Sequence, residues 1–193
     1  MNKNINKKIY LLKHNNNVLV DVSILIKRNI LSPKDDDWMI DFLCNQYKNG
    51  LKEALNQYDN SPLPKKYIDG QDFIVTILPR EIIGHFIYFN DEIYVDADAI
   101  SNIKRTNAAF LIGHEIGHKI SKYINTKNIK SIYDEISRIF YISSSNKEKL
   151  NETFADLVGF IVNDNGTFSY PIDKDNGKKQ YAKRKVLESI YRI

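Results

Sequence analysis

Two histidines four residues apart, with a glutamate directly after the first, are the residues of this chain best suited to metal chemistry. His114 and His118 lie in a stretch whose apolar pattern predicts a helix. Residues four apart project from the same face of a helix, so both imidazoles can reach one ion at about 2.0–2.1 Å. Glu115 lies one step round the helix, where it can hold and deprotonate a water bound to that ion.

A catalytic zinc site uses three protein ligands and keeps one position open, so the chain must supply a third ligand. The other histidines are poor candidates, because His14 is remote in sequence and His85 begins a predicted strand. Glu152 and Asp156 are four apart on a later predicted helix and share a face that its apolar residues do not occupy. We expect Glu152 to be the third ligand; the alternative is that this pair forms an ordinary solvated helix face.

Small residues line both of these predicted helices. They are Ala109, Gly113 and Gly117 beside the histidines, and Ala155 and Gly159 beside Glu152. A glycine inside a helix costs about 0.5–1 kcal/mol relative to alanine. We therefore expect the two helices to cross closely at these residues, which would let a carboxylate on one reach an ion on the other. Close packing without any functional role is the alternative explanation.

The sequence His114-Glu115-x-x-His118 followed by Glu152 resembles the zinc signature of the gluzincin metallopeptidases. Asn151-Glu152-x-x-x-Asp156 is similar to the second signature of the same clan. Within the clan, residues 105–118 and 152–156 look most like the ImmA/IrrE-type metallopeptidases. The lethal-factor-like peptidases are the second resemblance, although Ser145 stands where that group carries a tyrosine.

The resemblance implies a zinc endopeptidase that hydrolyses peptide bonds of a protein or peptide substrate. It implies one Zn²⁺ per chain, bound by His114, His118 and Glu152, with Glu115 as the general base. It also implies that Asp156 and Asn151 act as outer partners of the metal ligands, with Asp156 beside His114.

A second donor to the oxyanion is expected in such an enzyme. Tyr133 and Tyr141 precede Glu152 on the chain and are the candidates for this donor. An ordinary core or surface position is the alternative for each tyrosine.

The elements that must position these residues follow an α+β order. The segments 9–13 and 18–28 form either a hairpin or a strand followed by a helix. Ser145 and Glu148 predict a capping box for the helix that carries Glu152. The further predicted elements are a helix over 39–55 opened by Ser32-Pro33, strands over 73–78, 85–90 and 92–96, helices over 103–124, 129–142 and 146–163, and a basic amphipathic segment over 178–192.

From this order we expect a zincin-like fold, in which a small, mostly antiparallel sheet packs on the helix that carries the two histidines. The strand 92–96 is expected either at the sheet edge, where a peptide could add as an extra strand, or as a plain half-buried strand. We expect a single domain over residues 1–193, with residues 1–70 as an amino-terminal helical or hairpin part. Residues 73–163 would form the catalytic core.

The composition narrows the class of protein. With 42% apolar residues and a charge of only +4, the chain does not have the composition of a disordered protein. It lacks any run of about 18 apolar residues, so no membrane partner is expected. The amino end does not have the pattern of an export signal, and Cys44 alone cannot form an internal disulfide. We expect a cytoplasmic protein with Cys44 in its core, while export without a signal peptide stays open.

Two other functions are compatible with the same residues. The chain could be an inactive zinc-bearing binding or regulatory module, although such a module has no use for Glu115. It could also be a basic nucleic-acid-binding domain, because Tyr181 lies among the basic residues of segment 178–192. The small net charge argues against a nucleic-acid partner.

Overall fold

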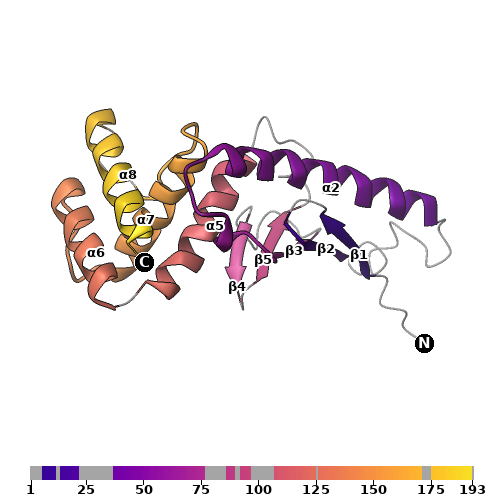
Figure 1. Cartoon of the computed structure of the whole chain (residues 1–193), viewed down its shortest axis with the longest axis horizontal. Helices are drawn as coiled ribbons and strands as arrows, with labels where there is room; N and C mark the ends of the chain where they lie inside the picture. The colour runs from indigo at the N-terminus through magenta and orange to yellow at the C-terminus, as the bar shows by residue number, and fades with distance from the viewer. Residues whose placement is uncertain are drawn as a thin grey trace. The chain divides into compact units, whose positions relative to one another are not determined.

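The structure of the chain is a computed structural model that describes residues 6–11, 14–21, 37–76, 86–89, 92–96, 107–124, 126–170 and 175–192. The chain divides into two compact units, one of residues 1–55 with 68–108 and one of residues 56–67 with 109–193 (Figure 1). The described elements confirm the predicted α+β class. The expectation of one domain over residues 1–193 stays a prediction.

The first unit contains a five-stranded sheet. Its strands are β1 (Asn6–Leu11), β2 (Asn16–Asp21), β3 (Asp72–Thr76), β4 (Phe86–Phe89) and β5 (Glu92–Asp96). They lie in the order β1-β2-β3-β5-β4, with β2, β3 and β5 parallel and with β1 and β4 antiparallel to their neighbours. The prediction of a mostly antiparallel sheet is therefore wrong. Between β2 and β3 the chain forms helix α2 (Asp37–Asn60), which supplies a crossover of the length that a parallel pair needs.

The two antiparallel pairs correspond to local hairpin signals. β1 and β2 form a hairpin whose turn includes Asn15 in the left-handed conformation, with φ of 51°, so the hairpin alternative holds over residues 6–21. β4 and β5, which fall on the predicted strands over 85–90 and 92–96, also pair antiparallel. The edge position expected for residues 92–96 is wrong, because β5 inserts between β3 and β4 and is paired on both sides.

The core of the first unit is built from alternate strand residues and one face of α2. Side chains at every second position of the three parallel strands are fully buried, as period-two alternation dictates. These are Val18, Phe73, Val75, Ile93 and Val95. On α2, Leu51, Ala54 and Leu55 follow the helical period and are also buried, which confirms the predicted helix over 39–55.

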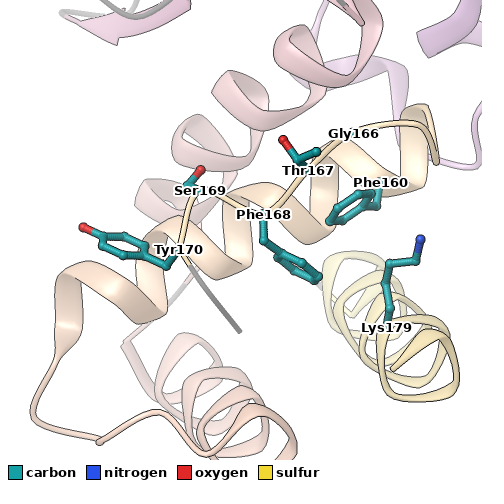
Figure 2. A pocket seen from close by; sticks show the side chains of 7 residues that line it. All are labelled: Phe160, Gly166, Thr167, Phe168, Ser169, Tyr170 and Lys179. Carbon is teal, nitrogen blue, oxygen red and sulfur yellow. The ribbon is translucent and has the colours of Figure 1, made fainter. Parts of the chain in front are cut away.

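Further helices follow the sheet in the described part of the chain. They are α5 (Ala108–Tyr123), α6 (Thr126–Phe140), α7 (Lys147–Val162) and α8 (Asn176–Tyr191). The first three fall on the predicted helices over 103–124, 129–142 and 146–163, and α8 falls on the predicted basic amphipathic segment over 178–192. The predicted cap of α7 is wrong by one residue, because the Asn146 side chain accepts the backbone N–H of Lys149 at 3.0 Å. The Ser145 hydroxyl instead lies 2.7 Å from that of Ser143. After α7, residues 163–170 run back along this helix before α8 begins (Figure 2).

Some sequence expectations fall on parts of the chain outside this description. Ser32, Pro33, His85 and Arg105 lie outside the described residues, as does the side chain of Cys44. Among the helices of the described part, none combines the length and the apolar character needed to cross a bilayer.

Within the second unit, α5 and α7 approach almost to backbone contact. A Cβ atom added to Gly117 would lie 2.7 Å from the Cα atom of Ala155, and one added to Gly113 would lie 2.9 Å from the Cα atom of Gly159. These are the small residues that the sequence singles out, and they face one another across the helix pair. The predicted close crossing is therefore confirmed.

We predict that Gly117→Ala destabilises the metal-free protein by about 1–3 kcal/mol, because the added methyl group meets backbone rather than a movable side chain. This cost should exceed the gain of about 1 kcal/mol from the better helix propensity of alanine. Gly177→Ala is the matched control, since its Cβ would meet only the Asp175 side chain, at 3.1 Å. Urea unfolding followed by circular dichroism measures both variants; equal stability of the two would contradict the prediction.

Candidate metal centre

Helix α5 directs His114 and His118 toward a common point. Their Nε2 atoms lie 3.0 Å apart, and the two ring planes stand at 84° to each other. The rotation of the helix is fixed by a different stripe of side chains, which is fully buried. That stripe consists of Ile112, Ile116 and Ile120.

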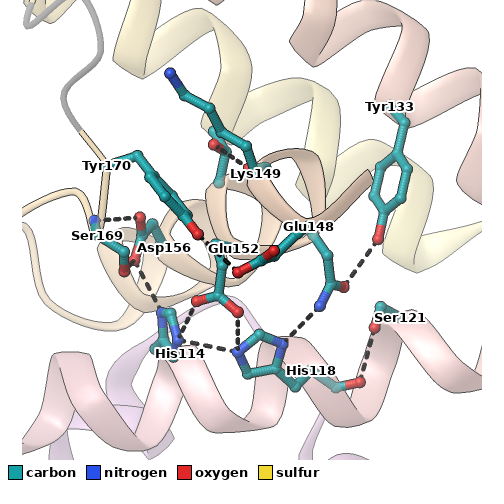
Figure 3. Close-up of polar contacts among 12 residues, drawn as sticks. His114, His118, Ser121, Tyr133, Glu148, Lys149, Glu152, Asp156, Ser169 and Tyr170 are labelled. Carbon is teal, nitrogen blue, oxygen red and sulfur yellow. Dashed lines mark hydrogen bonds and ion pairs between the residues drawn. The ribbon is translucent and has the colours of Figure 1, made fainter. Parts of the chain in front are cut away.

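Helix α7 brings Glu152 to the same point (Figure 3). Its Oε2 atom lies 3.4 Å from Nε2 of His114, and its Oε1 atom lies 3.4 Å from Nε2 of His118. The ligand atoms of the three residues all lie within 4.8 Å of one another. His114, His118 and Glu152 therefore form a group that could hold a metal ion.

The spacing of the donor atoms fits a single small ion. Two ligands of one tetrahedral ion, each at about 2.0–2.1 Å from it, lie about 3.4 Å from each other. The two Nε2 atoms lie 3.0 Å apart, and each lies 3.4 Å from a different carboxylate oxygen of Glu152, which is close to that value.

Asp156 holds the far side of the first histidine. Its Oδ1 atom lies 2.9 Å from Nδ1 of His114, and the carboxylate is 1% exposed. Ser169 in turn donates its backbone N–H to Oδ2 at 2.7 Å and its hydroxyl to Oδ1 at 2.8 Å. A carboxylate fixed in this way accepts the Nδ1–H of His114 and leaves Nε2 free to face an ion.

Asn151 occupies the equivalent place beside the second histidine. Its Nδ2 atom lies 3.1 Å from Nδ1 of His118, and its Oδ1 atom accepts the Tyr133 hydroxyl at 2.9 Å. A histidine that binds a metal through Nε2 carries its proton on Nδ1 and needs an acceptor there. With a metal bound, the Asn151 amide would therefore turn its oxygen to His118 and its N–H to the Tyr133 oxygen.

The charges of the group differ sharply between the two histidines. Burial opposes the protonation of His114, but hydrogen bonds with Asp156 and Glu152 overcome it and raise its pKa to about 10. Burial and the charge on His114 lower the pKa of His118 to about 4. The hydrogen bond with His114 lowers the pKa of the Glu152 carboxyl. At neutral pH and without a metal, His114 is therefore protonated and His118 is neutral.

The remaining sequence candidates differ in their relation to this group. Glu115 is 4% exposed, and its charge contributes to the raised pKa of His114, so it lies close to the ligands. Tyr133 is in contact with Asn151, and burial together with the Glu152 charge raises the pKa of its hydroxyl to about 12. Tyr141 is 82% exposed and lies beneath the Lys178 ammonium, so the structure does not bring it to the group.

Two residues at this centre were not predicted. Ser169 holds Asp156, and Tyr170 donates its hydroxyl to Glu148 at 2.9 Å, one turn before Glu152 on α7. Both come from the segment after α7, where the sequence shows only the helix stop Asn165-Gly166. No short-range pattern relates a serine to an aspartate thirteen residues earlier, so this contact depends on how the segment returns along α7.

Comparison with known proteins adds no relative to this description. No family model, curated protein or solved structure matches the chain.

We predict that zinc binding at pH 6 releases about one proton per ion, because the metal displaces the Nε2 proton of His114. His118 is already neutral at this pH and contributes none. The affinity should therefore rise with pH until the pH reaches the raised pKa of His114. Isothermal titration calorimetry in buffers of different ionisation enthalpy counts the protons; zinc binding without proton release would contradict the charge assignment.

We predict that Asp156→Asn weakens zinc binding by about 10–100-fold, because the His114 ring loses its charged partner. Asp164→Asn is the control. Asp164 lies in residues 163–170, the return segment that runs back along α7, but its carboxylate pairs with Lys179 and Lys183. Competition with a chromophoric chelator measures the dissociation constants. An Asp156→Asn variant that binds zinc as tightly as the control would show that this contact does not support the site.

Proposed function

We propose that the chain is a zinc-dependent endopeptidase acting on a protein or peptide substrate. The observation that carries this proposal is the convergence of His114, His118 and Glu152, from two helices, with the buried carboxylate of Glu115 beside them. Two imidazoles and one carboxylate are a ligand set typical of catalytic zinc. Magnesium and calcium prefer sites made of oxygen ligands, which this group does not provide.

Each residue of the group has a chemical task in this proposal. His114, His118 and Glu152 would hold one Zn²⁺ per chain, which when bound would polarise the scissile carbonyl and acidify a water molecule. Glu115 would accept the proton of the attacking water and pass it to the leaving amine. Asp156 would keep the ring of His114 oriented, as Asn151 would keep that of His118.

The resemblance of the sequence to gluzincin metallopeptidases supports the same function. Asn151 contacts His118, Glu152 belongs to the ligand group, and Asp156 contacts His114. The resemblance to the second signature of that clan implies these roles. A zincin-like fold is part of this proposal. So is the family assignment, in which the ImmA/IrrE-type metallopeptidases come first and the lethal-factor-like peptidases second.

The alternative functions have less support. The basic side chains of α8 are largely engaged within the chain: Lys179 and Lys183 pair with Asp164, and Arg184 and Lys185 pair with Glu188. Such pairing reduces the charge that α8 offers to a nucleic acid. An inactive zinc-bearing module would not need a carboxylate buried beside the ligands.

We predict that Glu115→Gln lowers peptide hydrolysis by about 10²–10⁴-fold while zinc stays bound, because the amide keeps the shape but cannot accept a proton. The matched control is Glu188→Gln on α8, which should retain activity. A peptide library with zinc present, read by mass spectrometry, measures the cleavage.

Each alternative gives a different result in this assay. Equal cleavage by the Glu115→Gln and control proteins would reject Glu115 as the base. Stoichiometric zinc without cleavage by the unaltered chain would favour the inactive module. A purified protein that does not bind zinc would reject the metal site.

A further inference from the structure

A pocket lies between the return segment and helices α7 and α8. Its volume is about 420 Å³, which falls in the range of small-molecule sites. Its lining is drawn in Figure 2 and consists of Phe160 of α7, Lys179 of α8 and Gly166, Thr167, Phe168, Ser169 and Tyr170 of the return segment. The proposed mechanism of hydrolysis does not use this pocket.

Rigid aromatic rings form one wall of the pocket. The rings of Phe160 and Phe168 meet edge to face, with centroids 4.7 Å apart, and Phe168 also contacts the Phe140 ring at 5.6 Å. Phe160 is 3% exposed, so its position is fixed by packing on the inner side. An apolar ligand would therefore meet a preformed surface rather than one that must reorganise.

The charge beside this wall is positive. The ammonium of Lys179 lies 4.8 Å from the centre of the Phe160 ring. Lys179 and Lys183 both pair with the same oxygen of Asp164, each at 3.1 Å, and their side chains are only 18% and 17% exposed. Two ammonium groups that share one carboxylate leave an excess of one positive charge, partly screened from water by the surrounding side chains.

The polar groups of the lining suit an anion with a small apolar body. Lys179 is the charged side chain of the lining, whereas the Ser169 hydroxyl is already donated to Asp156. A carboxylate can accept a charge-assisted hydrogen bond from this ammonium. A neutral ligand of the same shape would leave the excess charge of Lys179 uncompensated.

We propose that this pocket binds a small monocarboxylate with an aromatic or similarly bulky apolar body. The apolar part would pack on Phe160 and Phe168, and the carboxylate would pair with Lys179. Phe160, Phe168 and Lys179 are distinct from the proposed metal ligands, and this proposal does not depend on peptidase activity.

The test uses 3-phenylpropionate as the probe and 3-phenylpropionamide as its neutral counterpart, titrated by calorimetry into the full chain with zinc present. We expect the acid to bind with a dissociation constant of about 1 mM or tighter. The acid should bind at least about tenfold tighter than the amide, which corresponds to the pairing of one charge.

Two matched variants locate the binding. Lys179→Met should weaken binding of the acid to the level of the amide, because methionine keeps an apolar stem without the charge. Lys185→Met removes an ammonium of the same helix that pairs with Glu188 and does not line the pocket, so the preference for the acid should remain. Circular dichroism and zinc content check that both variants are folded.

Three results would overturn the proposal. These are no binding of either probe at millimolar concentration, equal binding of acid and amide by the unaltered chain, and retention of the acid preference in Lys179→Met. The last result is the one expected if the carboxylate instead binds zinc, since that contact does not involve Lys179. Loss of peptidase activity in Glu115→Gln would leave the pocket unaffected, so this proposal and the proposed function fail independently.

Discussion

The candidate metal centre depends on the close approach of α5 and α7, because side chains of both helices must reach one ion. Gly117 faces Ala155, and Gly113 faces Gly159, so no bulky side chain separates α5 from α7. Three glycines inside two helices reduce their intrinsic helical stability by about 0.5–1 kcal/mol each relative to alanine. The close crossing gives this composition a structural reason, because it brings a glutamate within reach of two imidazoles.

The second requirement is that the buried polar groups find partners on the side away from the ion. Asp156 is almost fully buried and receives three hydrogen-bonding contacts, one from His114 and two from Ser169. Asn151 contacts both His118 and Tyr133. A buried polar group without partners would cost about 1–3 kcal/mol, so these contacts both satisfy the polar atoms and fix the ring orientations.

The features predicted correctly from the sequence depend on short-range patterns. The spacing of His114 and His118, the helices of the second unit and the strands of the β4–β5 pair follow from periodicity. The β1–β2 hairpin is one of the two arrangements that the sequence left open. The close crossing of α5 and α7 was predictable because small residues recur at helical spacing on both helices.

The features that sequence analysis missed depend on pairing between distant segments. The parallel arrangement of β2, β3 and β5 is set by which strands meet after a crossover, and alternation within one strand carries no information about that. The same holds for Ser169, whose contact with Asp156 requires the chain to turn back along α7. At the cap of α7, Asn146 and Ser145 are both good capping residues, and only the backbone path decides between them.

The contact between Asp156 and Ser169 has a thermodynamic consequence for the chain after α7. One carboxylate anchors both the ligand ring of His114 and the return segment, so an ion and that segment are linked through a single side chain. Such linkage is reciprocal. If a bound ion stabilises this conformation of residues 163–170 by some factor, then fixing that conformation raises the affinity for the ion by the same factor. The effect of the ion on the return segment and the effect of that segment on metal affinity therefore report the same coupling free energy.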